Sequence, residues 1–347
     1  MHARYARVRR WEFWPRWLFY LPLLPFWVLL ALKHWSATIW TAANTCMPHG
    51  GVVGERKSDI LSRLPGWAVV PFELIDAAEG GARVAQFGRL VRERGWAFPL
   101  IAKPDVGERG EGFRLLLDFA TAEAALREHS EALLIQPYHA GPFEAGVFYV
   151  RPPGSSRGKI FSITDKYFPR VIGDGYSNVR TLLWADARYR IQAGTFLSRL
   201  GPLAERVPRA GEPVALAAAG NHCQGTLFRD GSHLLTPALE RAIDEIALRI
   251  DGFHFGRFDI RYENVEEFRR GERLAIIELN GVLSESTNIY DPSNSLFRAY
   301  LTLAKQWLLA FDIGAANARR GARVTGVLEL LRAVRMHAAR RVPRIAD

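Results

Sequence analysis

Two segments in the last third of the chain alternate in polarity like neighbouring β-strands. They are RFDIRYE (257–263) and RLAIIELN (273–280). Because side chains alternate along a strand, Glu278 and Asn280 share one face, and a paired strand can bring Asp259 beside them. Two carboxylates and an amide carbonyl are hard oxygen ligands, which suit Mg²⁺ better than zinc. The alternative is that these acids are solvated, or paired with Arg257 or Arg261.

A lysine followed by glycines marks a second candidate site. The short apolar segment FPLIAKP (98–104) contains Lys103, and Gly107, Gly110 and Gly112 follow it. Glycines allow backbone N–H groups to approach phosphate oxygens closely. The spacing matches neither a P-loop nor a dinucleotide-binding fingerprint. The alternative is an ordinary surface turn.

The remaining periodicity predicts strands with helices between them, which indicates an α+β or α/β fold. Strands are expected at 98–104, 133–138, 144–150, 159–168, 257–263 and 273–280. Helices are expected at 84–94, 121–130, 178–190, 236–250, 294–313 and 324–342. Residues 44–54 (NTCMPHGGVVG) are rich in glycine and are expected to form a loop at the start of the folded body.

Six of these pieces occur in an order that resembles the ATP-grasp superfamily, in particular D-alanine–D-alanine ligase and the ligase part of cyanophycin synthetase. They are PLIAKPDVGERGEG, LIQPYHAGPFE, TDKYF, VIGDGYSNVRTLL, FGRFDIRY and IIELNGVLSEST. The resemblance implies an α+β ATP-grasp fold in which two α/β lobes sandwich ATP. It places a catalytic domain at 44–313, with lobe 1 at about 55–135 and lobe 2 at about 136–313.

The resemblance also implies roles for individual residues. ATP would be held by Lys103, Gly107, Gly110, Gly112, Gln136, Tyr138, His139, Glu144 and Lys166, and Lys57 would be an early nucleotide contact. Within this set Lys103 and Lys166 would contact phosphates, Gln136–His139 would hold adenine, and Glu144 would hold the ribose. Asp259, Glu278 and Asn280 would bind Mg²⁺, or Mn²⁺ in its place, and Arg257 would stabilise the phosphorylated intermediate. Substrate would lie beside Gly281, Ser284, Ser286 and Thr287.

The implied reaction is that of a carboxylate–amine ligase. A substrate carboxylate attacks the γ-phosphate of ATP to form an acyl phosphate, and an amine then displaces phosphate to form an amide. Two alternatives stay open: an ATP-grasp phosphotransferase acting on a hydroxyl, and a non-catalytic, membrane-associated nucleotide-binding module. The expected partners are small-molecule carboxylates and amines.

The first 43 residues form a basic and hydrophobic arm, which stands where most ATP-grasp enzymes carry a further α/β domain. Residues 17–32 (WLFYLPLLPFWVLLAL) contain no charge but are too few to span a bilayer as a helix. Tryptophans crowd both sides, as is typical of the headgroup layer. We expect this arm to lie in a membrane interface. The alternatives are that it packs on the protein's own body or is a signal peptide, and the use of ATP argues against export.

The charge distribution supports a membrane surface over nucleic acid. Residues 1–16 carry a net charge of +4 and residues 314–347, an expected basic helical tail, carry +6. Together they account for the whole excess of +10, so the body between them is neutral. Nucleic-acid binding needs a basic face on the folded body, whereas basic ends are attracted to anionic headgroups. We therefore expect no nucleic-acid partner and a cytoplasmic, peripheral location on the inner face of the cell membrane.

Overall fold

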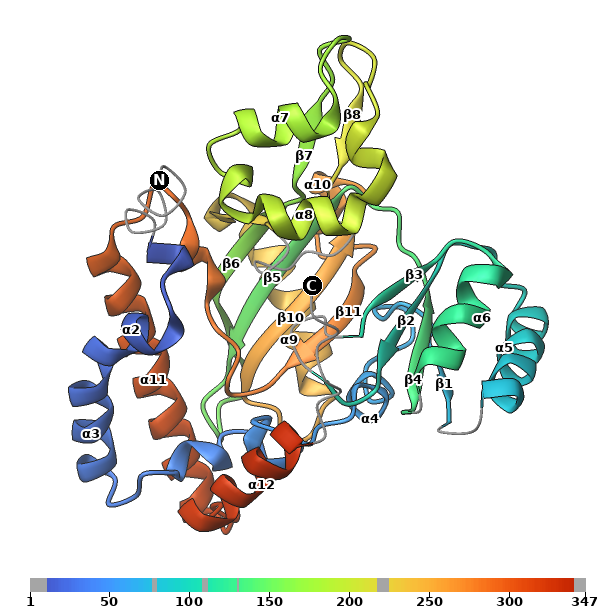
Figure 1. Ribbon diagram of the computed structural model, residues 1–347. Helices are drawn as coiled ribbons and strands as arrows, with labels where there is room; N and C mark the ends of the chain where they lie inside the picture. The colour runs from blue at the N-terminus through green and yellow to red at the C-terminus, as the bar shows by residue number, and fades with distance from the viewer. Residues whose placement is uncertain (1–10, 77–79, 108–111, 130, 217–224, 340–347) are drawn as a thin grey trace.

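The computed structural model describes residues 11–76, 80–107, 112–129, 131–216 and 225–339. Helices and antiparallel sheets are both present, so the α+β class is confirmed. Figure 1 shows a large sheet at the centre, a smaller sheet on one side of it and a helical arm on the other.

The large sheet has five antiparallel strands in the order β11-β10-β5-β6-β9. They are β5 (Phe143–Val150), β6 (Lys159–Tyr167), β9 (Leu227–Asp230), β10 (Phe255–Tyr262) and β11 (Ala275–Asn280). One face is apolar and packs with α9 (Pro237–Leu248) into a buried core that includes Val147, Phe258 and Ile260. Thr236 caps α9: the hydroxyl accepts a hydrogen bond from the Leu239 N–H.

The smaller sheet has four antiparallel strands in the order β1-β4-β2-β3. They are β1 (Glu73–Ile75), β2 (Leu100–Pro104), β3 (Arg114–Leu116) and β4 (Leu133–Pro137). Helices α5 (Gly80–Arg94) and α6 (Phe119–Glu128) cover it and share a core with it that includes Phe87, Leu100 and Leu126. This separate core makes the sheet and its helices a lobe distinct from the large sheet.

The two sheets are joined through the segment before β1. The Val70 N–H donates to the carbonyl of Ile276 on β11, and the Ile276 N–H donates to the carbonyl of Ala68. Gln136 on β4 in turn donates its side-chain amide to the carbonyl of Val70. Helix α4 (Lys57–Leu61) also contacts β11. The edge strand β11 therefore lies where the lobes meet.

A small unit projects from the large sheet, at the top of Figure 1. It contains the strand pair β7 (Arg170–Ile172) and β8 (Pro213–Ala215), with α7 (Val179–Ala185), η5 (Tyr189–Gln192), α8 (Ala193–Leu200) and η6 (Gly201–Glu205). The single helix expected at 178–190 ends at Ala185. Asp186 stops it, because its carboxylate accepts hydrogen bonds from the N–H groups of Arg188 and Tyr189.

The N-terminal arm runs along the long helix α11 (Leu296–Arg319) and packs on it. The arm consists of η1 (Trp11–Phe13), α2 (Arg16–Tyr20), η2 (Leu21–Leu23) and α3 (Leu24–Lys33). The Trp27 ring of α3 meets the Phe311 ring of α11 edge-on, with centroids 5.8 Å apart. Helix α11 continues past residue 313, so the expected end of the catalytic domain lies inside one helix. Within the described ranges, no helix combines the length and apolarity needed to cross a membrane.

The glycine-rich segment 44–54 is packed into the body. Asn44 is 1% exposed; its amide donates to the carbonyls of Gly50 and Phe255, and its oxygen accepts from the N–H groups of His254 and Phe255. The bond to Gly50 closes the segment on itself, and the other three bonds tie it to the start of β10. The remaining elements are η3 (Ile39–Ala42), η4 (Pro48–Gly50), η8 (Ser232–Leu234), α10 (Val265–Arg269), η9 (Thr287–Tyr290) and α12 (Val327–Ala339).

Candidate active site

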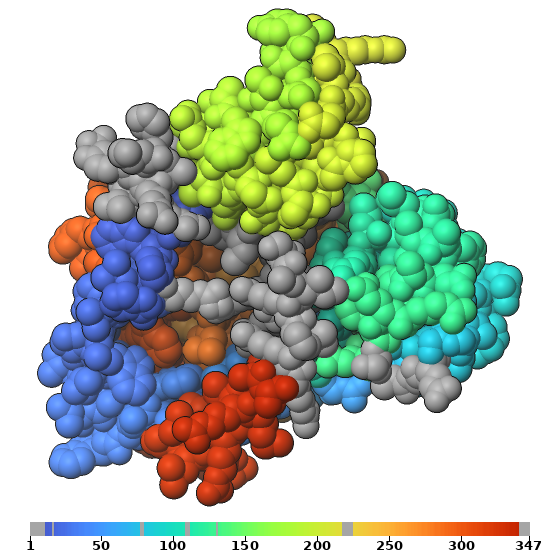
Figure 2. Space-filling view, viewed as in Figure 1, coloured from blue at the N-terminus to red at the C-terminus, as the bar shows by residue number. Residues whose placement is uncertain are grey.

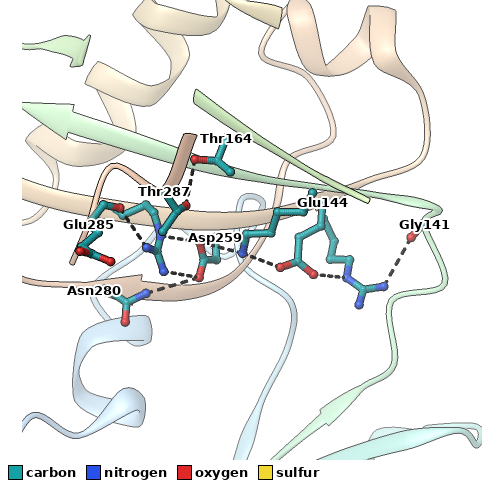
Figure 3. Close-up of polar contacts among 10 residues, drawn as sticks. Gly141, Glu144, Thr164, Asp259, Asn280, Glu285 and Thr287 are labelled. Atoms are coloured by element: carbon teal, nitrogen blue, oxygen red, sulfur yellow. Dashed lines mark hydrogen bonds and ion pairs between the residues drawn. The ribbon is translucent and has the colours of Figure 1, made fainter. Parts of the chain in front are cut away.

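The register of β10 and β11 brings together the three oxygen-bearing residues grouped from the sequence. Asp259 lies directly opposite Glu278, and Arg257 lies directly opposite Asn280. Direct cross-strand partners project from the same face of a sheet. The Asn280 Nδ2 lies 3.5 Å from Asp259 Oδ2, as Figure 3 shows. The face that carries them is the one opposite the apolar core.

Asp259 also forms ion pairs with two cations. One of them is Arg257, so the alternative considered from the sequence, an acid paired with Arg257, is present at this site. Arg257 donates from Nε to Asp259 Oδ1 at 2.9 Å and from Nη2 to Oδ2 at 3.2 Å. Lys166 Nζ lies 3.1 Å from Asp259 Oδ1. Arg257 donates further to the carbonyl of Glu285 at 3.0 Å. The Arg257 guanidinium thus joins the Asp259 carboxylate to the loop after β11.

Glu144 on β5 extends this row of charges along the same face. Its Oε1 accepts from Lys166 Nζ at 2.7 Å and its Oε2 from Arg261 Nε at 2.9 Å. Arg261 also donates to the carbonyls of His139 and Gly141, in the turn between β4 and β5. The Glu144 side chain is 3% exposed, so its two ion pairs position Lys166 and Arg261. A contact to ribose stays a prediction from the resemblance.

The charges in this row stabilise one another. Burial raises the pKa of the Asp259 carboxyl, but Arg257 and Lys166 outweigh that effect and lower it to about 2. Burial disfavours the charged form of Lys166, but Asp259 and Glu144 more than offset this and raise the pKa of its ammonium group. Burial similarly opposes the charge of Arg257, and Asp259 outweighs it, so the pKa of Arg257 is raised. All three groups are therefore charged at neutral pH.

Lys103 reaches this site from the smaller sheet. Its Nζ donates to the carbonyl of Ile277 at 2.8 Å. The pairing of β10 with β11 shifts after Asp259, from Glu278 to Ile276, so Ile277 is the extra residue of a β-bulge. The bulge releases the Ile277 carbonyl from the ladder and makes it available to Lys103, next to Glu278. Lysines from both lobes therefore approach the same pair of carboxylates.

Lys103 differs electrostatically from Lys166. Burial lowers the pKa of Lys103 to about 8, and Lys57 adds to this effect, while Glu278 and Asp259 oppose it. Part of its charge is therefore lost in mildly alkaline solution. The resemblance implies that this ammonium group contacts ATP phosphates, and such a contact would depend on pH.

We expect the affinity for ATP to be constant below pH about 8 and to fall above it by up to about tenfold per pH unit. Phosphate binds the protonated lysine, and the deprotonated fraction grows above the pKa. Calorimetric titration with ATP across this range measures the effect. Lys103→Arg should remove the decline because arginine stays charged, and Lys103→Met should bind weakly at every pH. The exposed Lys305→Arg is the matched control, and an undiminished affinity at high pH in the wild type would contradict the assignment.

The residue types of this set suit a magnesium ion, because carboxylate and amide oxygens are hard ligands. Asp259 and Glu278 lie opposite each other, and Asn280 lies on the same face with its Nδ2 turned towards Asp259 Oδ2. Rotation of the Asn280 amide would present its oxygen to the two carboxylates. In the part of the chain that the structure describes, no group of three or more His, Cys, Asp or Glu side chains has metal-site geometry. The predicted set of Asp259, Glu278 and Asn280 is not such a group, because its third member is an amide and not a His, Cys, Asp or Glu side chain. Mn²⁺ would be accepted by the same ligands.

The segment expected to hold adenine lies at the junction of the lobes, at the end of β4. Gln136 is buried and donates to the carbonyl of Val70, so its side chain links β4 to the segment before β1. The Tyr138 N–H donates to the carbonyl of Pro99, and the Arg261 guanidinium lies 5.5 Å from the centroid of the Tyr138 ring. Partial burial lowers the pKa of His139, whose Nδ1 accepts from the Gly141 N–H.

The glycine-rich segment after Lys103 is only partly described. Gly107 and Gly112 lie within the described residues, and Gly110 lies outside them. Gly112 has a φ of +70°, the left-handed region that favours glycine. Lys57 Nζ donates to the carbonyl of Gly107 at 2.6 Å, so this early lysine lies at the start of the segment.

The expected substrate segment is tightly folded. Gly281 packs on Gly51, and a Cβ on Gly281 would lie 2.6 Å from the Gly51 Cα. The Ser284 hydroxyl donates to the carbonyl of Gly281, and the Thr287 hydroxyl donates to the side-chain hydroxyl of Thr164 on β6. Ser286 forms a short hydroxyl–hydroxyl contact with Ser162. The loop is thereby fixed against β6, and a direct contact with substrate stays a prediction.

The sequence indicated Arg261 only as an alternative partner of the acids, and it did not indicate Gly146 or the Ile277 carbonyl. Arg261 follows Arg257 and Asp259 at the spacing of a strand, a pattern that places all three on one face. Gly146 lies opposite Asp259, where a Cβ would be 3.1 Å from Arg257 Cδ. A glycine two residues after Glu144 could have indicated room for a large side chain. No feature of the sequence indicated that the Ile277 carbonyl would accept from Lys103, because this contact depends on the bulge.

Comparisons with known proteins return solved structures only. Neither a protein-family model nor a curated protein matches the chain. Similar structures include a bifunctional glutathione synthetase from Pasteurella multocida (14% identity, TM-score 0.37, 74% of this chain and 38% of that one). They also include a D-alanine–D-alanine ligase from Helicobacter pylori (15%, 0.39, 73% and 60%) and a D-cycloserine synthetase (13%, 0.43, 85% and 84%).

The solved structures therefore include the type of ligase to which the sequence motifs are similar. The chain spans 38% and 60% of the first two of these proteins. These identities are at most 15%, and these TM-scores lie below 0.5.

Proposed function

We propose that this protein is an ATP-grasp carboxylate–amine ligase that requires Mg²⁺. The observation that carries the proposal is the convergence of Asp259, Glu278 and Lys166 on one sheet face with Lys103 from the other lobe. ATP carries about four negative charges, and a site for it must supply positive charge that is already in position. Here Lys103, Lys166 and Arg257 supply it.

The chemistry assigns a role to each group. Asp259, Glu278 and Asn280 would hold Mg²⁺, which offsets phosphate charge when bound. Lys103 would hold phosphate oxygens from lobe 1. Lys166 would contact the γ-phosphate from lobe 2. These positions are fixed before any ligand arrives, because Glu144 and Asp259 orient the lysine.

Arg257 would stabilise the charge that develops during the reaction. A substrate carboxylate oxygen bonds to the γ-phosphorus as the bond from that phosphorus to the β,γ-bridging oxygen breaks, and ADP leaves. An amine then bonds to the acyl carbon, phosphate leaves and a proton is released, which forms the amide. The Arg257 guanidinium faces the Glu285 carbonyl, so it lies between the metal ligands and the expected substrate segment.

Product analysis tests the proposal. Purified protein is incubated with Mg·ATP and mixtures of carboxylates and amines, ADP release is recorded, and products are identified by mass spectrometry. We expect ADP, phosphate and a new amide in equal amounts. A stable phosphoester would instead show the phosphotransferase, and ATP binding without ADP release in any mixture would show the non-catalytic module.

We further propose that the enzyme works as a peripheral protein on the cytoplasmic face of a membrane. Its basic chain ends and its use of ATP support this location. The N-terminal arm would provide the attachment, lying in the interface without crossing it.

A further inference from the structure

The arm leaves one of its sides uncovered. Helix α3 begins with LPFWVLLAL, which contains no charged side chain. Its inner side packs on the body: Leu30 is 4% exposed, and Phe26, Trp27 and Ala31 lie against the core formed with α11. Its outer side is equally apolar. A helix that is apolar on all sides is normally buried completely or in contact with lipid.

The outer side forms a continuous surface, which we call the α3 face. It consists of exposed apolar residues at helical spacing on η2 and α3: Leu21, Leu24, Val28, Leu29 and Leu32. Leu29 and Leu32 are 63% and 64% exposed. Large exposed apolar patches mark interaction sites, because each such side chain in water has a free-energy cost.

Helix α12 carries a second exposed apolar surface. Its Leu330 and Ala333 pack on the same apolar cluster as Leu30 of α3. Figure 2 shows α12 in red beside the arm in blue. Its outward residues are also apolar: Val327, Leu328, Leu331, Val334 and Met336. The exposed arginines Arg332 and Arg335 lie among them.

We propose that the α3 face and α12 together dock onto an anionic lipid bilayer. This deepens the membrane location proposed above and is independent of the ligase reaction, because it depends on different residues. Trp17 and Trp35 lie before and after the α3 face and are 70% and 95% exposed, as is typical of residues in the headgroup layer. Arginines beside apolar residues add attraction to anionic headgroups.

A second copy of the chain fits this surface less well. A symmetric dimer brings the same patch of both chains together. It would bring together two surfaces that both carry arginines, on chains that each have a net charge of +10. An anionic bilayer satisfies both the apolar residues and the arginines.

Vesicle flotation tests the proposal. The full chain is mixed with vesicles of phosphatidylcholine and phosphatidylglycerol, or of phosphatidylcholine alone, and floated in a density gradient. We expect the wild type to float with the anionic vesicles. Leu29→Glu with Leu32→Glu should weaken the binding by at least about tenfold, because two leucines leave the apolar layer. The matched control, Leu117→Glu with Leu203→Glu, changes exposed leucines elsewhere and should float like the wild type.

Arg332→Gln with Arg335→Gln is an independent second variant. It should reduce the preference for anionic vesicles by about fivefold per arginine and leave the fold unchanged. Absence of the wild type from the floating fraction would overturn the proposal, as would flotation unaffected by the two leucine substitutions. A wild-type dimer that these substitutions convert to a monomer, without flotation, would show that a second copy covers the face. Flotation needs no turnover, so failure of the ligase proposal would leave this result interpretable.

Discussion

Replacement of Glu278 by glutamine is expected to lower ATP turnover by about 10²–10³-fold with little loss of stability. The change keeps the shape of the side chain and removes one charged oxygen ligand from the pair formed with Asp259. Because Glu278 is only half-buried, the free energy of unfolding should change by no more than about 1 kcal/mol. ADP release at saturating ATP, measured over a range of Mg²⁺ concentrations, gives the effect.

Glu272→Gln is the matched control on the same hairpin. Glu272 is exposed and pairs at the surface with Arg270, so its replacement should leave turnover and the Mg²⁺ requirement unchanged. If Glu278→Gln keeps the wild-type rate at every Mg²⁺ concentration, Glu278 is no metal ligand and the proposed site is wrong.

Replacement of Asp259 by asparagine is expected to have a different signature, because it affects both the fold and the chemistry. Asp259 is buried and accepts from Arg257 and Lys166, so the substitution leaves the buried Lys166 and the partly buried Arg257 with one fewer carboxylate. Removal of one partner of a buried ion pair costs about 3–5 kcal/mol. We expect that loss in the free energy of unfolding, measured by urea denaturation, together with loss of turnover.

The surface variant Asp312→Asn is the control for Asp259. Asp312 pairs with Lys33 where both side chains are about half exposed, so its loss should cost at most about 1 kcal/mol. Equal urea midpoints for Asp259→Asn and the wild type would show that the ion pairs of Asp259 do not stabilise the fold.

The comparison of Asp259→Asn with the wild type should also show a dependence of stability on pH. The pKa of Asp259 is lowered to about 2 in the fold, against about 4 for an unfolded aspartate. The stabilisation from its charge is therefore fully present above pH about 4 and is lost as the pH falls towards about 2. The difference in stability between wild type and Asp259→Asn should shrink over that interval.

Much of this site was readable in the sequence because it depends on local periodicity. Alternation along two strands put Asp259, Glu278 and Asn280 on predictable faces, and Lys103 was recognisable at the end of a short apolar segment. The helix expected at 236–250 is α9, which runs over Pro237–Leu248. The end of α7 was not predicted, because Asp186 captures N–H groups that an uninterrupted helix would have used.

The amino-acid sequence alone determined which residues alternate, where helices are capped and which segments are apolar, because these properties depend on neighbours a few positions apart. Only the tertiary structure decided that Asp259 lies opposite Glu278 and pairs with Lys166. It alone also decided that a bulge at Ile277 presents a carbonyl to Lys103, and that one side of α3 is covered while the other is not. These features depend on register and packing between segments distant in the chain, and a shift of one residue in strand pairing would reverse the faces.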